Sequence, residues 1–178
     1  MATETDYIAE LGALALASRL RRLLHRLQCD GEKVYQSLNP GFKPKWFPVL
    51  HLLTNRPPLN LTEVAQLLSV AHPSVIETVN ELVDAGLVKS RRSEIDRRRR
   101  ELLLTNKGKQ LCNELQPVWD AFRAAGEEVD KEHGNSFLEA IAKLELSIED
   151  RSMYERIMAR LEKRTAHEEQ NVDEQTRR

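Results

Sequence analysis

Residues 89–100 concentrate the guanidinium groups of this chain in one short segment. Seven basic side chains lie there beside two acidic ones, Glu94 and Asp96; the basic residues are Lys89, Arg91, Arg92, Arg97, Arg98, Arg99 and Arg100. The formal net charge of the whole chain is −1, so the remaining residues are net acidic. Clustered arginines bind phosphate oxygens, but similar runs also occur on solvated surfaces. The element that presents the segment has to decide between these interpretations.

The pattern around the basic segment predicts a hairpin that follows two short helices. Residues 87–92 and 99–104 read as strands, with 93–98 as the hairpin tip. Before them, Thr62 is the expected N-cap of a helix over 63–68, and a second helix over 74–85 follows the turn at 69–73. A helix in this position fits the DNA major groove, and arginines on the hairpin suit the negative potential of the minor groove. The order of elements is that of a winged helix-turn-helix.

The flanking sequence predicts a mainly α protein in which the hairpin is the only sheet. With 40% apolar, 31% charged and 5% aromatic residues, the composition favours helices. We expect an N-terminal dimerisation helix in 1–38, a DNA-binding domain in 39–105, C-terminal dimerisation helices in 106–165 and a disordered tail in 166–178. Pro117 is expected to kink or break the helix after the hairpin. A capping box at 136–139 is expected to open a further helix, and a second helix either starts at 147 or runs together with the first.

The segment from Leu61 to Leu111 resembles the MarR (multiple antibiotic resistance regulator) family. It reads LTEVAQLLSVAHPSVIETVNELVDAGLVKSRRSEIDRRRRELLLTNKGKQL. The features in common are Leu61-Thr62 at the first helix, Gly86-Leu87-Val88 before the hairpin, Asp96-Arg97-Arg98 at its tip, and Leu104-Thr105 with Gly108 after it. The resemblance implies a homodimeric regulator of transcription, more often a repressor, that binds double-stranded DNA.

The resemblance also implies roles for individual residues. Arg98 would enter the minor groove, Asp96 would orient the hairpin tip, and Thr62 would lie near a phosphate. The full set of expected DNA-binding residues is Thr62, His72, Ser74, Thr78, Arg91, Arg92, Arg97 and Arg98. One departure is that the second helix shows Glu77, Glu81 and Asp84 on the face opposite Val75, Val79, Leu82 and Val83. Acidic groups near phosphates oppose binding, so the alternative is a winged module that binds protein.

Other chemistry has weaker support in the sequence. Trp46, Phe47 and His51 are candidates for the border of a small-molecule effector pocket, although aromatic residues at helical spacing are more often core. The five histidines show no metal-ligand spacing, and we expect no metal, no cofactor and no catalytic residue. Cys29 and Cys112 make no disulfide framework and read as buried residues of a cytoplasmic protein rather than oxidant sensors. The sequence contains no stretch long and apolar enough for a membrane span.

Overall fold

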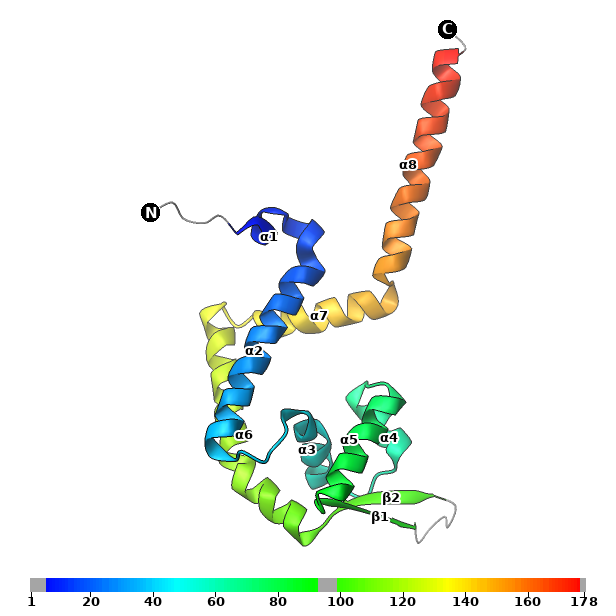
Figure 1. The fold of residues 1–178 in the computed structure, drawn as a ribbon. Helices are drawn as coiled ribbons and strands as arrows, with labels where there is room; N and C mark the ends of the chain where they lie inside the picture. The colour runs from blue at the N-terminus through cyan, green and yellow to red at the C-terminus, as the bar shows by residue number, and fades with distance from the viewer. Residues whose placement is uncertain (1–5, 93–98, 177–178) are drawn as a thin grey trace. The chain divides into compact units, whose positions relative to one another are not determined.

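The computed structural model describes residues 6–92 and 99–176. The chain divides into two units, residues 1–116 and 117–178. The fold is mainly α with one small two-stranded antiparallel sheet, as the sequence predicts (Figure 1). The elements in chain order are α1 (Tyr7–Glu10), η1 (Gly12–Ala15), α2 (Leu16–Leu38), η2 (Pro44–Trp46), α3 (Phe47–Asn55), α4 (Leu61–Leu68), α5 (His72–Asp84), β1 (Val88–Arg92), β2 (Arg100–Leu104), α6 (Asn106–Glu132), α7 (Phe137–Asp150) and α8 (Met153–Thr176).

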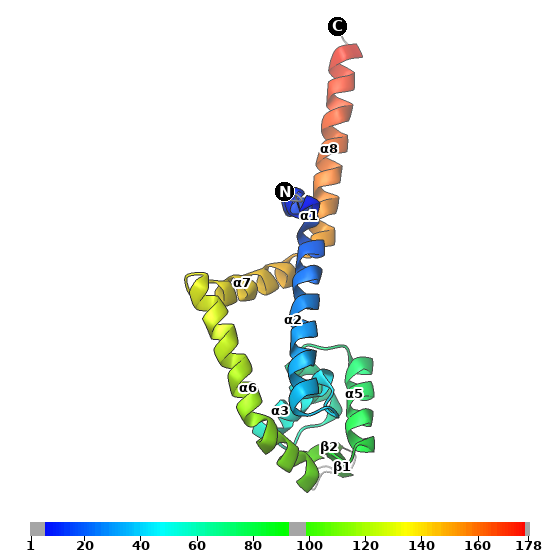
Figure 2. The ribbon, with the colours of Figure 1, turned by 60° about the vertical axis from the view of Figure 1, so that its left-hand side comes forward.

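The N-terminal helix is shorter than the sequence indicates. Gly12 has a φ of +53°, a left-handed conformation that glycine adopts without steric cost, and it separates α1 from the elements that follow. From Leu16 onward α2 is continuous, including Gly31, and its C-terminal end lies next to the segment that leads into α3 (Figure 2). The N-terminal helix expected within residues 1–38 is therefore interrupted before Leu16.

The core of the first unit lies where α3, α4, α5 and the sheet meet. Leu50, Leu53, Val64, Leu82 and Val88 are its most deeply buried side chains. They come from four helices or strands that are close in sequence, so short loops are sufficient to bring them together. This core fixes the positions of α4, α5 and the hairpin relative to one another.

The hairpin forms with the predicted strands and an antiparallel register. Val88 pairs with Leu104, and Arg92 pairs with Arg100 at the end near the tip. Leu59, shortly before α4, makes a single isolated bridge to Leu102 of β2. The hairpin tip at 93–98 lies outside the described residues.

In the second half of the chain, α6 continues through Pro117 without a break, and α7 begins directly after Ser136, where the sequence placed a helix start. The Ser136 hydroxyl donates to the His133 carbonyl, so the expected capping box does not form. The next helix begins not near Ser147 but at Met153, where Ser152 and Glu155 form a reciprocal capping pair. α8 then runs to Thr176, where we expected a disordered tail from 166; this stretch lacks Pro and Gly, so nothing in it stops the helix.

Gly108 permits the first turn of α6 to pack closely against the backbone of Leu87, which lies between α5 and β1. A Cβ at this position would overlap the carbonyl oxygen of Leu87, whereas a Cβ at Gly126 in the same helix meets nothing within 4 Å. We expect Gly108→Ala to cost about 1–3 kcal/mol, as overpacking does. Gly126→Ala, the matched control, should stabilise by up to about 1 kcal/mol because alanine favours helix. Thermal unfolding followed by circular dichroism measures both, and equal melting temperatures would contradict the close approach.

Candidate nucleic-acid interface

Local sequence signals define the helix-turn-helix formed by α4 and α5. The Asn60 side chain accepts a hydrogen bond from the Glu63 backbone N–H at 3.0 Å, and the Asn60 N–H donates to the Glu63 carboxylate at 2.8 Å. Asn60 is thus the N-cap of α4, and Thr62, the predicted cap, is an exposed residue of the first turn. Ser69 ends α4 in the left-handed conformation, and α5 begins three residues later.

The buried stripe of α5 consists of Val75, Val79 and Leu82. Val83, which the sequence placed inside with them, is 41% exposed. His72 and Ser74 are exposed near the N-terminus of α5, as a base-contacting role would require. Thr78 is half-buried, and its hydroxyl donates to the Ser74 carbonyl at 3.0 Å.

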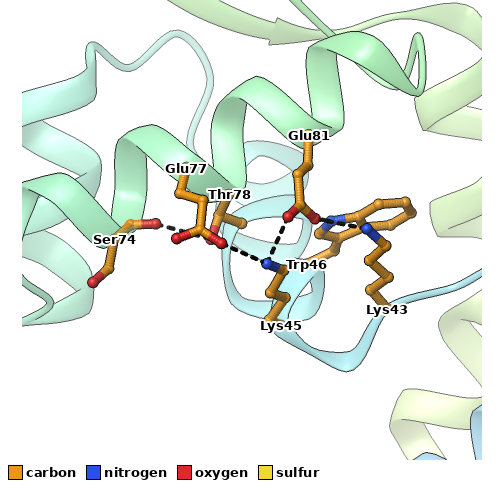
Figure 3. Close-up of polar contacts among 7 residues, drawn as sticks. All are labelled: Lys43, Lys45, Trp46, Ser74, Glu77, Thr78 and Glu81. Carbon is orange, nitrogen blue, oxygen red and sulfur yellow. Dashed lines mark hydrogen bonds and ion pairs between the residues drawn. The ribbon is translucent and has the colours of Figure 1, made fainter.

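Two of the three acidic side chains of α5 bond to the segment before α3 (Figure 3). The Glu81 carboxylate accepts hydrogen bonds from the Lys45 ammonium at 2.6 Å, the Trp46 indole N–H at 3.0 Å and the Lys43 ammonium at 3.1 Å. The Lys45 ammonium also donates to Glu77 at 3.0 Å. We call these five residues the Glu81 cluster. Asp84 is exposed at the C-terminal end of the helix.

The electrostatics of the Glu81 cluster favour its charged state. The hydrogen bond from Lys45, followed by those from Trp46 and Lys43, lowers the pKa of Glu81 to about 2. Hydrogen bonds to Glu81 and Glu77 raise the pKa of Lys45 in turn. The negative charges that argued against DNA binding are thus partly offset by two lysines whose partnership with α5 has no sequence signal, because they lie more than 30 residues away.

We define the wing as β1, β2 and residues 93–99 between them; its described residues carry arginines on both strands and at Arg99. The Arg91 guanidinium donates to Glu101 on the opposite strand at 3.2 Å, and that of Arg99 donates to Glu63 on α4 at 3.3 Å. The second contact ties the wing to the helix-turn-helix. Glu63 therefore has two roles, capping α4 and holding the wing, and the sequence predicted neither.

Some wing residues remain exposed and close to others of like charge. Arg92 and Arg100 are exposed and directly opposite in the register of the sheet. Like charges in this arrangement repel, so a polyanion that approaches the strands relieves a cost already present in the free protein. The tip residues Asp96, Arg97 and Arg98 lie outside the described residues, and their proposed roles stay predictions.

The predicted pocket residues are not brought together as a group. Trp46 lines a cavity of about 360 Å³ with Phe42, Leu87 and Leu111, and the Phe42 and Trp46 rings meet edge to face. Phe47 and His51 are not among the described residues that line it; their rings lie 5.4 Å apart on the first turns of α3. The effector-pocket role of these three residues stays a prediction.

The cysteines are separate in the fold. Cys112 is buried in α6, and burial raises the pKa of its thiol, which disfavours the reactive thiolate. Cys29 is half-buried on α2, with its sulfur 3.7 Å from a His25 ring nitrogen.

Within residues 6–92 and 99–176, no group of three or more His, Cys, Asp or Glu side chains is arranged to hold a metal ion. Over the same ranges, no helix is long and apolar enough to cross a membrane.

Known proteins share the sequence pattern and the fold described above. A sequence model of the MarR family matches residues 41–99, from η2 through most of the wing. Over these residues the chain shares the sequence pattern of the MarR family. The chain is also similar to the HTH-type transcriptional regulator PetP of Rhodobacter capsulatus, 37% identical over 82 residues, which are 43% of this chain and 49% of PetP. The alignment thus spans about half the length of that curated relative.

Solved structures extend the similarity beyond the matched segment. A structure of the transcriptional repressor CouR bound to a 23-mer DNA duplex superposes with a TM-score of 0.63 at 26% identity, over 75% of this chain and 96% of CouR. A MarR transcriptional regulator from Methanosarcina mazei gives a TM-score of 0.58 at 24% identity, over 75% and 97% of the two chains. The similarity in fold thus covers about three quarters of the chain, more than the segment that the family model matches.

The depressed pKa of Glu81 leads to a pH-dependent stability. Because the folded pKa of about 2 lies below the ordinary value of 4.5, the Glu81 cluster stabilises the protein above pH 4.5, and this contribution disappears as the pH falls toward 2. Glu81→Gln should lower the melting temperature at pH 7, and the gap from the parent should narrow below pH 4.5.

Asp84→Asn is the matched control, since it removes one negative charge from the same helix outside the Glu81 cluster. Melting temperatures of the parent and both variants between pH 7 and pH 3 check this. A gap between Glu81→Gln and the parent that stays constant across the range would contradict the assignment.

Proposed function

We propose that this chain is a sequence-specific regulator of transcription of the MarR family, acting as a repressor and binding double-stranded DNA as a homodimer. The observation that carries the proposal is the hydrogen bond from Arg99 to Glu63, which joins the wing to the helix-turn-helix. It holds an arginine-bearing hairpin beside α5, the helix suited to the major groove. The DNA duplex in the CouR structure supports the same use of this fold.

The alternative, a winged module that binds protein, rested on the acidic face of α5. In the structure Glu77 and Glu81 are paired with Lys43 and Lys45, so the face that meets a partner is less acidic than the sequence suggests. The arginines of the wing favour a polyanion over a protein surface. We therefore retain DNA as the proposed partner.

A second copy of the chain is the proposed partner for the apolar surface of α2. Seven apolar side chains there are more than a third exposed: Leu16, Leu20, Leu23, Leu24, Leu27, Val34 and Leu38. They recur at helical spacing and form one stripe over the length of the helix. Apolar residues on α7 and α8 are exposed in the same way, among them Leu138, Ile141, Ile148, Ile157 and Leu161. Exposed apolar stripes of this extent mark association surfaces.

Polar substitution in the α2 stripe should dissociate the dimer. The double variant Leu20→Asp, Leu27→Asp places charges in the proposed interface, and we expect monomers in sedimentation velocity at micromolar concentration while the parent sediments as a dimer. Gln36→Asp, on another face of the same helix, is the control and should remain dimeric. A folded parent that sediments as a monomer would refute the homodimer.

The wing prediction concerns Arg98, the residue that the family resemblance places in the minor groove. Arg98→Ala should weaken duplex binding and lower the slope of log affinity against log salt by about one per subunit, because about one phosphate contact is lost. Lys143→Ala is the control, because it removes one positive charge from α7, outside the winged helix-turn-helix segment. Fluorescence anisotropy of labelled duplex in a salt series measures both.

Two outcomes would count against the proposal in different ways. Unchanged affinity and slope in Arg98→Ala would remove Arg98 from the interface. Absence of salt-sensitive binding of the parent to any duplex would overturn DNA binding itself and favour the protein-binding alternative.

A further inference from the structure

We infer that α5 selects A·T base pairs in the major groove, with Asn80 as the side chain that reads adenine and Ile76 as the one that contacts the thymine methyl group. This inference rests on the proposed DNA binding and goes beyond it by naming the bases and the residues. It departs from the sequence-based expectation that the base contacts come from the N-terminal part of this helix, around His72, Ser74 and Thr78.

The helix α5 contains no lysine and no arginine. Its thirteen residues read HPSVIETVNELVD. The commonest specific contact to guanine is a bidentate hydrogen bond from Arg or Lys to its O6 and N7 atoms. This helix cannot make that contact, so its strongest remaining base reader is an amide side chain.

The Glu81 cluster binds one flank of α5 to the segment before α3. Ser74, Glu77, Thr78 and Glu81 are spaced by three or four residues and share this flank, beside Lys45 and Trp46 (Figure 3). A free glutamate accepts a hydrogen bond from cytosine N4, but these carboxylates already accept hydrogen bonds from lysines. The Thr78 hydroxyl is likewise bonded to the Ser74 carbonyl.

Ile76 and Asn80 lie on a face of α5 that remains exposed. Ile76 and Asn80 are four residues apart, so they lie one above the other on α5 and away from the buried Val75, Val79 and Leu82. Asn80 is exposed, and Ile76 is 38% exposed. The asparagine amide donates to adenine N7 and accepts from its N6 amino group, and alkyl carbons pack on the thymine C5-methyl. The open face therefore matches adenine and thymine together.

Selection of duplexes from a random library by the full-length parent gives the first readout. We expect enrichment of A·T pairs in the part of each half-site covered by α5. Replacing the adenine proposed to pair with Asn80 by guanine should weaken binding by roughly 5- to 100-fold, the range for a bidentate base contact. Asn80→Ala should lose most of this discrimination. Asn113→Ala, which removes an exposed asparagine from α6, is the matched control and should keep it.

A second readout tests Ile76 without depending on Asn80. Uracil in place of thymine removes only the C5-methyl group, so the parent should bind the uracil duplex more weakly than the thymine duplex. Ile76→Ala should bind the two duplexes equally. Melting temperatures and sedimentation of each variant establish that the fold and assembly are intact, because both side chains are exposed.

The outcomes separate this inference from the function on which it rests. Enrichment of G·C pairs, or full adenine discrimination in Asn80→Ala, would overturn the inference while salt-dependent duplex binding left the proposed function standing. Loss of all duplex binding in the parent would overturn both. Adenine discrimination that disappears in Asn80→Ala and persists in Asn113→Ala would establish it.

Discussion

The carboxylate of Glu81 joins α5 to the segment that leads into α3 through three donors, two ammonium groups and one indole N–H. Exposed ion pairs contribute little to stability one by one, but the indole bond is partly buried and directional. Three valine and leucine side chains on α5 determine which side of the helix faces the core. The Glu81 cluster adds a constraint on rotation about the helix axis, and rotation decides which side chains a bound duplex would meet.

The same bonds change the electrostatic character of the helix. Four of the titratable groups around α5, Lys43, Lys45, Glu77 and Glu81, are arranged as ion pairs. A helix with three acidic and no basic residues would repel phosphates if its charges were free. Pairing within the protein lowers that repulsion without adding a cation to the helix itself. The positive charge needed for a polyanion is supplied by the wing, on a different element.

Wing and helix are connected by Glu63, the partner of the N-cap residue Asn60 in α4. Glu63 accepts hydrogen bonds from the Asn60 backbone at the start of the helix-turn-helix and from Arg99, which directly precedes β2. The position of the wing is therefore tied to the helix that supports α5, while Arg92 and Arg100 stay exposed as a like-charged pair. Carboxylates thus orient Arg91 and Arg99, whereas Arg92 and Arg100 repel each other. This arrangement suits a ligand rich in negative charge.

The sequence by itself determined the order of the elements, both strands of the wing and the apolar stripe of α5 apart from Val83. These follow from local rules, namely turn residues, strand alternation and helical periodicity, which act over a few residues. Its errors at Gly12, Thr62 and the C-terminal tail were errors of helix boundaries, where one cap or one backbone angle decides; at Ser136 the helix start was right and only the side-chain bond differed. Tertiary structure alone brought Lys43 and Lys45 to Glu77 and Glu81, and Arg99 to Glu63. These contacts join residues more than 30 positions apart, and no local pattern encodes a distance in space between side chains that only the packed core brings together.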